Sequence, residues 1–364
     1  MSTTEQPSRH ADGADRVSMD GRRARATQAG SDSIGFDESA PLLEVEDLQV
    51  EFRTLEGVAN AVNGATFSVA EGETLGILGE SGCGKSVTAQ AIMGILDSPP
   101  AFIGGGKVVL RGVDLLTLPE ETRRKVRANH VAIVFQDALS SLNPVFTVGY
   151  QLGELFRRHR GYTKADARKE AISLLDLVGI PAAADRVSDF PHQFSGGMRQ
   201  RVMIAMSLAL DPDLLIADEP TTALDVTVQA QIMKLLSDLK AERNMGLILI
   251  THDMGVVADV ADKICVMYAG RIVERADVHR IYANPAHPYT KALLESIPRV
   301  DLKGQQLASI EGLPPTLTKL PPGCSFNPRC FMARDRCTHE EPPLYDVGGG
   351  RHSACHYYEE VLAR

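Results

Sequence analysis

The sequence predicts an α/β protein with a mainly parallel sheet, on three observations. Apolar runs typical of buried strands occur at 131–135, 214–217, 246–250 and 263–268. Amphipathic helical patterns alternate with them at 163–178, 198–209 and 232–239. The chain has 364 residues, of which 44% are hydrophobic and 23% charged, which is typical of a globular protein with one large domain and a smaller one.

The ordered chain is expected to begin at residue 41, where alternating apolar residues predict a strand through 42–50. Residues 1–40 are rich in small polar and charged side chains and are predicted to form a disordered tail. Two further strands are expected at 65–69 and 74–78, separated by a turn at Glu71-Gly72.

These patterns predict a large domain over residues 41–284. Within it, the block from about 137 to 200 is helical and interrupts the strands, so we expect it to form a helical lobe inserted into the sheet domain. From 285 onwards the pattern weakens into Pro-rich connections, which predict a separate C-terminal extension over 285–364.

Charge and hydropathy exclude several classes of protein. The 38 basic and 47 acidic side chains give a net charge of −9, which argues against a nucleic-acid partner because binding phosphates needs a basic excess. No apolar run approaches the roughly 18 residues that span a bilayer, and residues 1–40 lack the apolar core of a signal peptide. We therefore expect a cytoplasmic protein that reaches a membrane only through partners.

A glycine-rich segment at 79–86 matches the P-loop pattern G-x-x-x-x-G-K-[ST]. It follows a predicted strand and precedes a helical run, and its backbone amides should surround phosphate oxygens. We expect Lys85 to reach the β- and γ-phosphates and Ser86 to ligate Mg²⁺. The alternative, an ordinary glycine-rich turn, does not explain this context. The predicted nucleotide-contacting residues are Gly79, Glu80, Ser81, Gly82, Cys83, Gly84, Lys85, Ser86 and Val87.

A second element supplies carboxylates. The buried run at 214–217 ends in Asp218 and Glu219, the Walker B arrangement. Asp218 should organise Mg²⁺, and Glu219 should polarise the attacking water. Two acids at a strand end are common by themselves, but beside a P-loop they predict ATP hydrolysis.

The segment at 194–201, Phe-Ser-Gly-Gly-Met-Arg-Gln-Arg, resembles the signature of ATP-binding cassette (ABC) proteins, LSGGQ followed by Gln-Arg. Phe194 and Met198 depart from that pattern. Ser195, Gly196 and Gly197 remain, and a hydroxyl with bare amides at a helix start suits a γ-phosphate. As an isolated string these residues would indicate only a flexible loop. Their position between the P-loop and the acidic strand favours the ABC interpretation.

The resemblance, which spans about 42–274, assigns further residues. Gln136 resembles the Q-loop glutamine that contacts Mg²⁺. The segment Ala-Leu-Asp at 223–225, which contains Asp225, resembles the D-loop. His252 resembles the switch histidine, and Phe52 is the aromatic residue expected to stack on adenine. Without the resemblance, Gln136 and His252 would be read as polar residues at strand ends.

The resemblance implies an ABC nucleotide-binding domain with a parallel core, an antiparallel part and an inserted helical subdomain. Two such domains pack head to tail, with ATP between the P-loop of one and the signature of the other. The implied activity is ATP hydrolysis, with Glu219, His252, Lys85 and Gln136 in catalytic roles. A soluble ABC ATPase of DNA repair or translation and a non-catalytic, ATP-gated module remain the alternatives.

The segments at 284–294 and 310–315 resemble the C-terminal part of oligopeptide, dipeptide and nickel importer ATPases. The resemblance implies a second ABC ATPase subunit, identical or related, two transmembrane permease subunits and an extracytoplasmic substrate-binding protein. It places the chain peripherally on the cytoplasmic face of the bacterial inner membrane. Peptides are the favoured cargo and nickel the alternative.

Four cysteines gather near the C-terminus, whereas only Cys83 and Cys265 precede them. In a reducing cytosol such a cluster favours metal binding over disulfides. The wide spacing and the related importers favour a [4Fe–4S] cluster, with Zn²⁺ or free thiols as alternatives. The predicted ligands are Cys324, Cys330, Cys337 and Cys355.

Overall fold

The computed structural model describes residues 34–137, 141–222, 224–297 and 310–364. The predicted tail lies outside the described residues up to position 33. Residues from Phe36 to Arg364 form one compact unit. This unit begins before the expected residue 41, because the backbone of Asp37 and the carboxylate of Glu38 both bind Arg111, whose side chain is buried.

The N-terminal strands form an antiparallel sheet in the order β2-β1-β4-β5. Its bounds are Leu43–Thr54 for β1, Gly57–Val69 for β2, Ala101–Leu110 for β4 and Val113–Asp114 for β5. Inward-facing residues such as Val45, Val50 and Val108 are almost completely buried, so this sheet presents one apolar face to the rest of the unit.

The main sheet runs in the order β11-β12-β10-β9-β3-β8-β7-β6. The strands from β9 to β6 are parallel, and β10, β12 and β11 continue the sheet in antiparallel pairing. Its bounds are Thr74–Leu78 for β3, Val131–Val134 for β6, Leu214–Asp218 for β7, Gly246–Thr251 for β8, Lys263–Tyr268 for β9, Arg271–Asp277 for β10, Tyr345–Gly348 for β11 and Arg351–Ser353 for β12. The predicted parallel core is confirmed.

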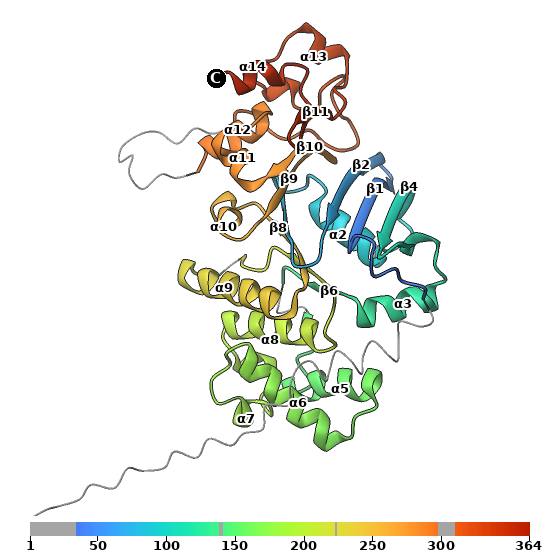
Figure 1. Ribbon diagram of the computed structural model, residues 1–364, viewed down its shortest axis with the longest axis vertical. Coiled ribbons are helices and arrows are strands. Elements are labelled where there is room, and N and C mark those ends of the chain that lie inside the picture. The colour runs from blue at the N-terminus through green and yellow to red at the C-terminus, as the bar shows by residue number, and fades with distance from the viewer. Residues whose placement is uncertain (1–33, 138–140, 223, 298–309) are drawn as a thin grey trace, which may run out of the picture. The chain divides into compact units, whose positions relative to one another are not determined.

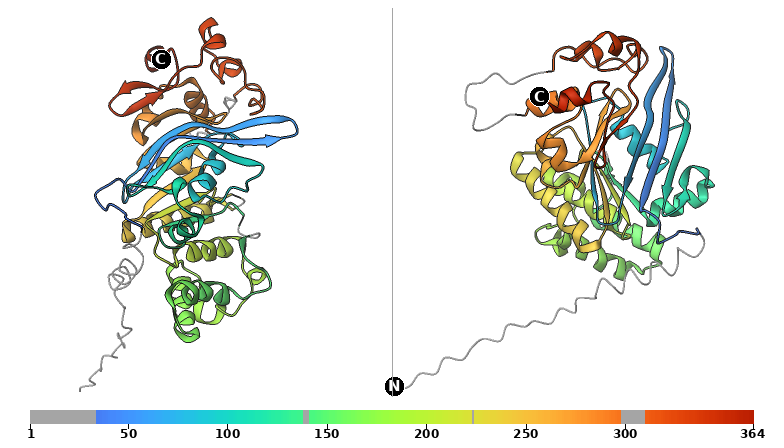
Figure 2. Two further views of the ribbon diagram at one scale, coloured as in Figure 1. Left: turned by 90° about the vertical axis from the view of Figure 1, so that its right-hand side faces the viewer. Right: turned by 45° about the horizontal axis from the view of Figure 1, so that its top comes forward.

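Helices cover both faces of the main sheet (Figure 1). Helix α2 (Lys85–Met93) contacts strands of both sheets and so lies between them. On the other side of the main sheet lie α8 (Gly196–Leu208) and α9 (Val226–Arg243), as the two further views show (Figure 2). The remaining helices near the sheets are α3 (Glu120–Asn129), α10 (Met254–Ala258), α11 (Val278–Ala283) and the short turn η2 (Leu115–Thr117).

The expected helical block follows β6. It contains α5 (Val148–Arg160), α6 (Lys164–Leu177), α7 (Ala183–Arg186) and η3 (Pro191–Gln193), and α8 leads back to β7. Thr163 caps α6 by accepting a hydrogen bond from the Asp166 amide at 3.2 Å. Residues 138–140, at the start of the predicted block, lie outside the described residues.

The C-terminal part differs from the predicted separate extension. Strand β12 pairs with β10, so the chain after residue 340 completes the main sheet. Its helices are short: α12 (Pro288–Glu295), η4 (Asn327–Arg329), α13 (Asp335–His339) and α14 (Tyr358–Leu362). The Phe326 side chain is 1% exposed, and its ring centroid lies 5.2 Å from those of both Tyr268 and Tyr289. This packing anchors the segment that carries the four C-terminal cysteines, 324–355, to β9 and α12.

Candidate functional site: a phosphate-binding cavity

The candidate site lies where four parallel strands end. Strand β3 leads into the P-loop, and Gln136 follows β6. Asp218 ends β7, and His252 follows β8. Because carboxyl ends of parallel strands meet at one edge of a sheet, residues far apart in the sequence come together there.

The P-loop backbone depends on its glycines. Gly79, Gly82 and Gly84 have φ values of 154°, 78° and 108°, which L side chains rarely adopt. A Cβ at Gly84 would lie 2.2 Å from the Ala61 carbonyl oxygen. The loop then delivers Lys85 as the first residue of α2, whose N-terminus favours bound anions.

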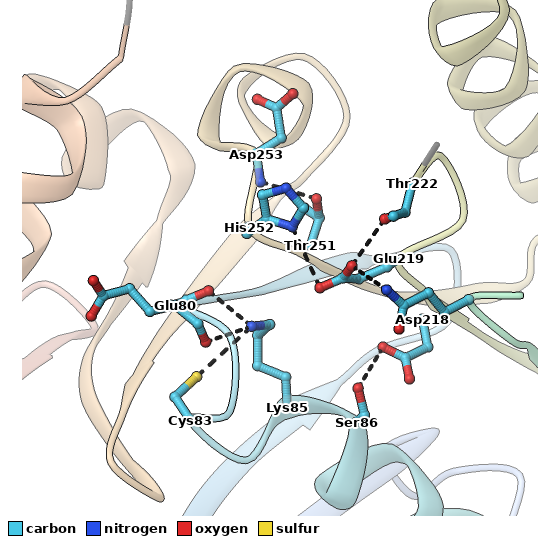
Figure 3. Close-up of polar contacts among 12 residues, drawn as sticks. Glu80, Cys83, Lys85, Ser86, Asp218, Glu219, Thr222, Thr251, His252 and Asp253 are labelled. Atoms are coloured by element: carbon cyan, nitrogen blue, oxygen red, sulfur yellow. Dashed lines mark hydrogen bonds and ion pairs between the residues drawn. The ribbon is translucent and has the colours of Figure 1, made fainter. Parts of the chain in front are cut away.

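Lys85 is 4% exposed and its Nζ atom donates to the carbonyl oxygens of Gly79 and Glu80, at 2.8 and 2.9 Å (Figure 3). The buried Cys83 thiol lies 3.9 Å from the same nitrogen, and burial raises the pKa of this thiol. The ammonium is therefore held inside the loop by neutral acceptors, where a phosphate oxygen can replace one of them.

The two acidic residues at the end of β7, Asp218 and Glu219, contact the P-loop helix and the segments that follow β6 and β8. Ser86 Oγ donates to Asp218 Oδ1 at 3.0 Å. Burial raises the pKa of Asp218, against the opposing effect of the Ser86 hydrogen bond. Glu219 accepts hydrogen bonds from Gln136 and Thr222, both at 2.9 Å. His252 Nδ1 lies 3.4 Å from the Glu219 carboxylate, as the close-up of Glu219, Thr222 and His252 shows (Figure 3).

The P-loop and the ends of the strands surround a cavity of about 660 Å³, whose lining does not include the predicted site residues Gly79, Cys83 and Asp218. The predicted site residues among its lining are Glu80, Ser81, Gly82, Gly84, Lys85, Ser86, Val87, Gln136, Glu219 and His252. The sequence analysis did not identify Ala61, Pro314 and Leu317, which also line it. Nothing local marks these apolar side chains, because they join the site only through tertiary packing.

Phe52 is not among the lining residues. It lies in β1 opposite Ala59 of β2 and Ala101 of β4. Ala61, two residues further along β2 than Ala59, is the part of this sheet that reaches the cavity. The contact between Phe52 and adenine therefore stays a prediction, which the cavity lining does not support.

The predicted signature residues lie away from this cavity, at the start of α8. Ser195 accepts a hydrogen bond from the Met198 amide at 3.3 Å, and Gly196 and Gly197 open the helix. A Cβ at Gly197 would lie 2.7 Å from Val228 Cγ1, so α8 and α9 approach closely there. Asp225 caps α9 through the Val228 amide at 2.9 Å, and residue 223 lies outside the described residues.

The four C-terminal cysteines line one small apolar cavity together with Phe326 and Met332. Burial raises the pKa of Cys330 to about 11 and of Cys355 to about 12, so both are neutral thiols at pH 7 in this arrangement. Within the described ranges, no group of three or more His, Cys, Asp or Glu side chains is arranged to hold a metal ion. The four sulfurs are gathered, but they do not form the predicted metal site as they stand.

The fold and the cavity define a P-loop nucleotide-binding protein. Comparison with known proteins specifies the class further. Residues 62–222 match the family model of ABC transporters, and residues 273–337 match that of the oligopeptide/dipeptide transporter C-terminal region. The solved ATP-binding cassette MJ0796, a dimer in a post-hydrolysis state bound to ADP and Pi, superposes with a TM-score of 0.59 at 26% identity. That match covers 65% of this chain and 98% of the cassette.

Two curated relatives cover most of the chain. The oligopeptide transport ATP-binding protein OppD of Salmonella typhimurium is 51% identical over 314 residues, or 86% of this chain and 93% of the relative. The dipeptide transport ATP-binding protein DppD of Bacillus subtilis is 51% identical over 289 residues, or 79% and 86%. The chain belongs to the oligopeptide/dipeptide branch of the ABC transporter ATP-binding proteins, and it is an ATPase. Across the described residues, none of the helices combines the length and apolar character needed to span a bilayer.

Proposed function

We propose that this chain is the ATP-hydrolysing subunit of an importer for oligopeptides or dipeptides. The observation that carries the proposal is the convergence of Lys85, Ser86, Gln136, Glu219 and His252 on one cavity. The relatives' names supply the cargo class, since they are transport proteins for oligopeptides and dipeptides. Nickel remains the alternative cargo, which these relatives do not favour.

Each side chain has a role that follows from its position. Lys85 exchanges a backbone carbonyl for a phosphate oxygen of ATP, and Ser86 and Asp218, already hydrogen-bonded to each other, hold Mg²⁺ with Gln136. Mg²⁺, when bound, neutralises charge that develops on the phosphates. The residues fit this ion, because hydroxyl, carboxylate and amide oxygens are the ligands it prefers.

Glu219 is the general base for the attacking water in this proposal. Its Oε2 accepts hydrogen bonds from Gln136 and Thr222, and its Oε1 lies beside His252 Nδ1, so both carboxylate oxygens are oriented. A carboxylate that accepts a proton from water in a fixed orientation accelerates hydrolysis by a typical factor of about 10² to 10⁴. His252, with a side chain 60% exposed, remains free to contact the γ-phosphate.

The working unit is a pair of cassettes. Ser195, Gly196 and Gly197 are not among the residues lining this chain's cavity, so we propose that they and Asp225 serve the cavity of a second cassette, identical or related. The dimeric state named for the similar cassette supports this arrangement. We further propose two permease subunits and an extracytoplasmic substrate-binding protein as partners, at the cytoplasmic face of the bacterial inner membrane. The net charge of −9 argues against a nucleic-acid partner.

Glu219→Gln tests this proposal. The variant keeps the shape of the side chain and removes the base, so we expect ATP-dependent dimerisation to persist while turnover falls by about 10² or more. Sedimentation with ATP and phosphate release from the assembled complex measure the two effects. Glu242→Gln, an exposed acid on α9, is the matched control and should leave both unchanged. Turnover near the wild-type rate in Glu219→Gln would remove Glu219 from the base role.

The cargo is tested in the intact membrane complex. Co-purification identifies the permeases and shows whether the second cassette is the same chain. ATP turnover in proteoliposomes should rise with peptide-loaded binding protein and not with nickel-loaded protein. Stimulation by nickel alone would establish the alternative cargo, and a chain that co-purifies with no membrane protein would support the soluble alternative.

We also propose that Cys324, Cys330, Cys337 and Cys355 hold a [4Fe–4S] cluster, with Zn²⁺ as the alternative. Four thiols lining one cavity in a segment with little apolar core support this donor set, although they are not in a metal-binding arrangement in the structure. A bound metal would supply folding energy to this segment. Anaerobic purification with iron, sulfide and zinc analysis tests the site against a variant with all four cysteines changed to serine. A folded wild-type chain without any of the three would exclude both metals.

A further inference from the structure

The second residue of the P-loop is held by the C-terminal part of the chain. The Glu80 amide donates to Tyr289 Oη in α12 at 2.9 Å. Its carboxylate accepts two hydrogen bonds from Arg329, Nη1 to Oε2 at 2.6 Å and Nη2 to Oε1 at 2.9 Å. Figure 3 shows this carboxylate on the side of Glu80 that faces away from Lys85. Two-pronged contacts between arginine and a carboxylate fix both charge and orientation.

Arg329 is a rigid anchor for this contact. Its side chain is 4% exposed, and Nη1 also lies 3.3 Å from Tyr268 Oη. It ends η4 between Phe326 and Cys330, and the Phe326 ring is fixed among the tyrosines of β9 and α12. A buried guanidinium held on three sides loses little further freedom when it binds Glu80.

The same guanidinium also holds a segment that lines the nucleotide cavity. Its Nε donates to the Glu311 carbonyl oxygen at 3.1 Å. Pro314 and Leu317 follow Glu311 closely in the chain, and both line the cavity beside the P-loop. Arg329 therefore connects two parts of the cavity wall that are more than 200 residues apart.

We propose that Arg329 is a positioning residue for nucleotide binding, which neutralises and orients Glu80 within the P-loop. This inference rests on the proposed ATP site. Without Arg329, Glu80 would place an uncompensated negative charge in the loop that receives a triphosphate. This charge would oppose ATP binding. Nucleotide affinity thus depends on the folded state of the segment from Glu311 to Cys337.

The test is the dissociation constant for ATP, measured on the full-length chain by calorimetry. We expect Arg329→Gln to raise it about tenfold, as one unneutralised charge near a polyanion does in a partly screened site. Arg329→Lys keeps the charge but loses the two-pronged contact, so its dissociation constant should lie between those of wild type and Arg329→Gln. Arg334→Gln is the matched control, since Arg334 forms a two-pronged pair with Glu360 in the same C-terminal segment, at side chains half exposed to solvent.

Two further measurements separate this role from a merely structural one. Adding Glu80→Gln to Arg329→Gln removes the unpaired charge and should recover at least half of the lost affinity. The loss should also shrink from ATP to ADP to AMP and with rising salt, because repulsion follows ligand charge. A change in turnover without a change in nucleotide affinity would contradict the proposal.

The outcomes distinguish this inference from the function on which it rests. A wild-type chain that does not bind ATP contradicts the proposed function itself. A wild type that binds, with Arg329→Gln equal to Arg334→Gln, overturns the inference alone. If Arg329→Gln does not fold, the Lys variant and the double variant still test it, because unfolding caused by lost packing would not be reversed by Glu80→Gln.

Discussion

Glu274 is a buried carboxyl whose titration should lower the stability of the chain as pH rises towards neutrality. It lies in β10, 0% exposed, and accepts hydrogen bonds from the amides of Ala286 and His287 at 2.7 and 3.0 Å. Burial raises the pKa of Glu274 from 4.5 to about 7, while these amides and the Arg351 charge oppose the rise. This carboxyl therefore ties β10 to the start of the C-terminal part of the chain.

The sign of the effect follows from the two pKa values. Between 4.5 and about 7 the folded chain keeps the proton of Glu274 and the unfolded chain has lost it. The contribution of Glu274 to the free energy of unfolding therefore falls as pH rises through this window, by about 3 kcal/mol in all. About 1 kcal/mol of that falls between pH 6 and 8.5, a range that avoids the pI of about 5.6. The neighbouring His287, whose pKa burial lowers to about 3, contributes in the opposite direction, and this contribution is common to wild type and a Glu274 variant.

Urea unfolding at pH 6 and pH 8.5 measures this difference. The Glu274→Gln side chain cannot titrate. From pH 6 to pH 8.5, the free energy of unfolding of wild type should therefore fall by about 1 kcal/mol relative to that of the variant. Only the change between the two pH values is compared. The NH2 group of the introduced glutamine would face one of the two backbone N–H donors, so the variant is expected to be less stable than wild type at every pH. Glu359→Gln, an exposed acid, controls for general charge effects. Equal pH dependence in wild type and Glu274→Gln would refute the reasoning.

Two further substitutions test local geometry. Gly84→Ala should weaken ATP binding by more than about tenfold, because its Cβ would strike the Ala61 carbonyl at a positive φ, whereas Gly161→Ala, at a positive φ with open space around it, should not change binding. Calorimetric titration compares the two, and equal effects would contradict the steric argument. Arg111→Met should lower the free energy of unfolding by about 2 kcal/mol, because this buried cation pairs with Glu38 and Glu71, whereas Lys107→Met removes only an exposed pair. Urea unfolding measures both, and a smaller loss for Arg111 than for Lys107 would count against the pairing.

The strands of the parallel core were predictable because each is a short apolar run buried on both faces. Strand β3 and strand β9 have the predicted limits, and β6, β7 and β8 differ by one residue. Strand β2 begins at Gly57, eight residues before the predicted start. The prediction missed this part of the strand because residues 57–60 show no alternation of apolar and polar side chains. Strand β12 has only three residues and gains its partner, β10, about 80 residues away. No local periodicity marks such a strand.

The same distinction applies to the site. Lys85, Gln136, Glu219 and His252 each follow or begin a recognisable element, so parallel pairing brings them together. Arg329 is surrounded by Pro and Cys in a segment without regular pattern, and its contact with Glu80 spans 249 positions. The sequence pattern singles out the four cysteines of this segment, whereas the residue that contacts the P-loop is Arg329, which directly precedes Cys330.

The contact between Glu80 and Arg329 joins the two regions that the family models separate. Glu80 lies in the part matched as ABC transporter, and Arg329 in the part matched as the oligopeptide/dipeptide C-terminal region. Both belong to one compact unit. A chain ending before Glu311 would therefore lose more than an appendage: it would expose the buried rings of Tyr268 and Tyr289 and leave the Glu80 carboxylate without its cation. Because both losses fall beside the P-loop, the C-terminal region of this chain is part of the wall of the cavity and not only an addition to it.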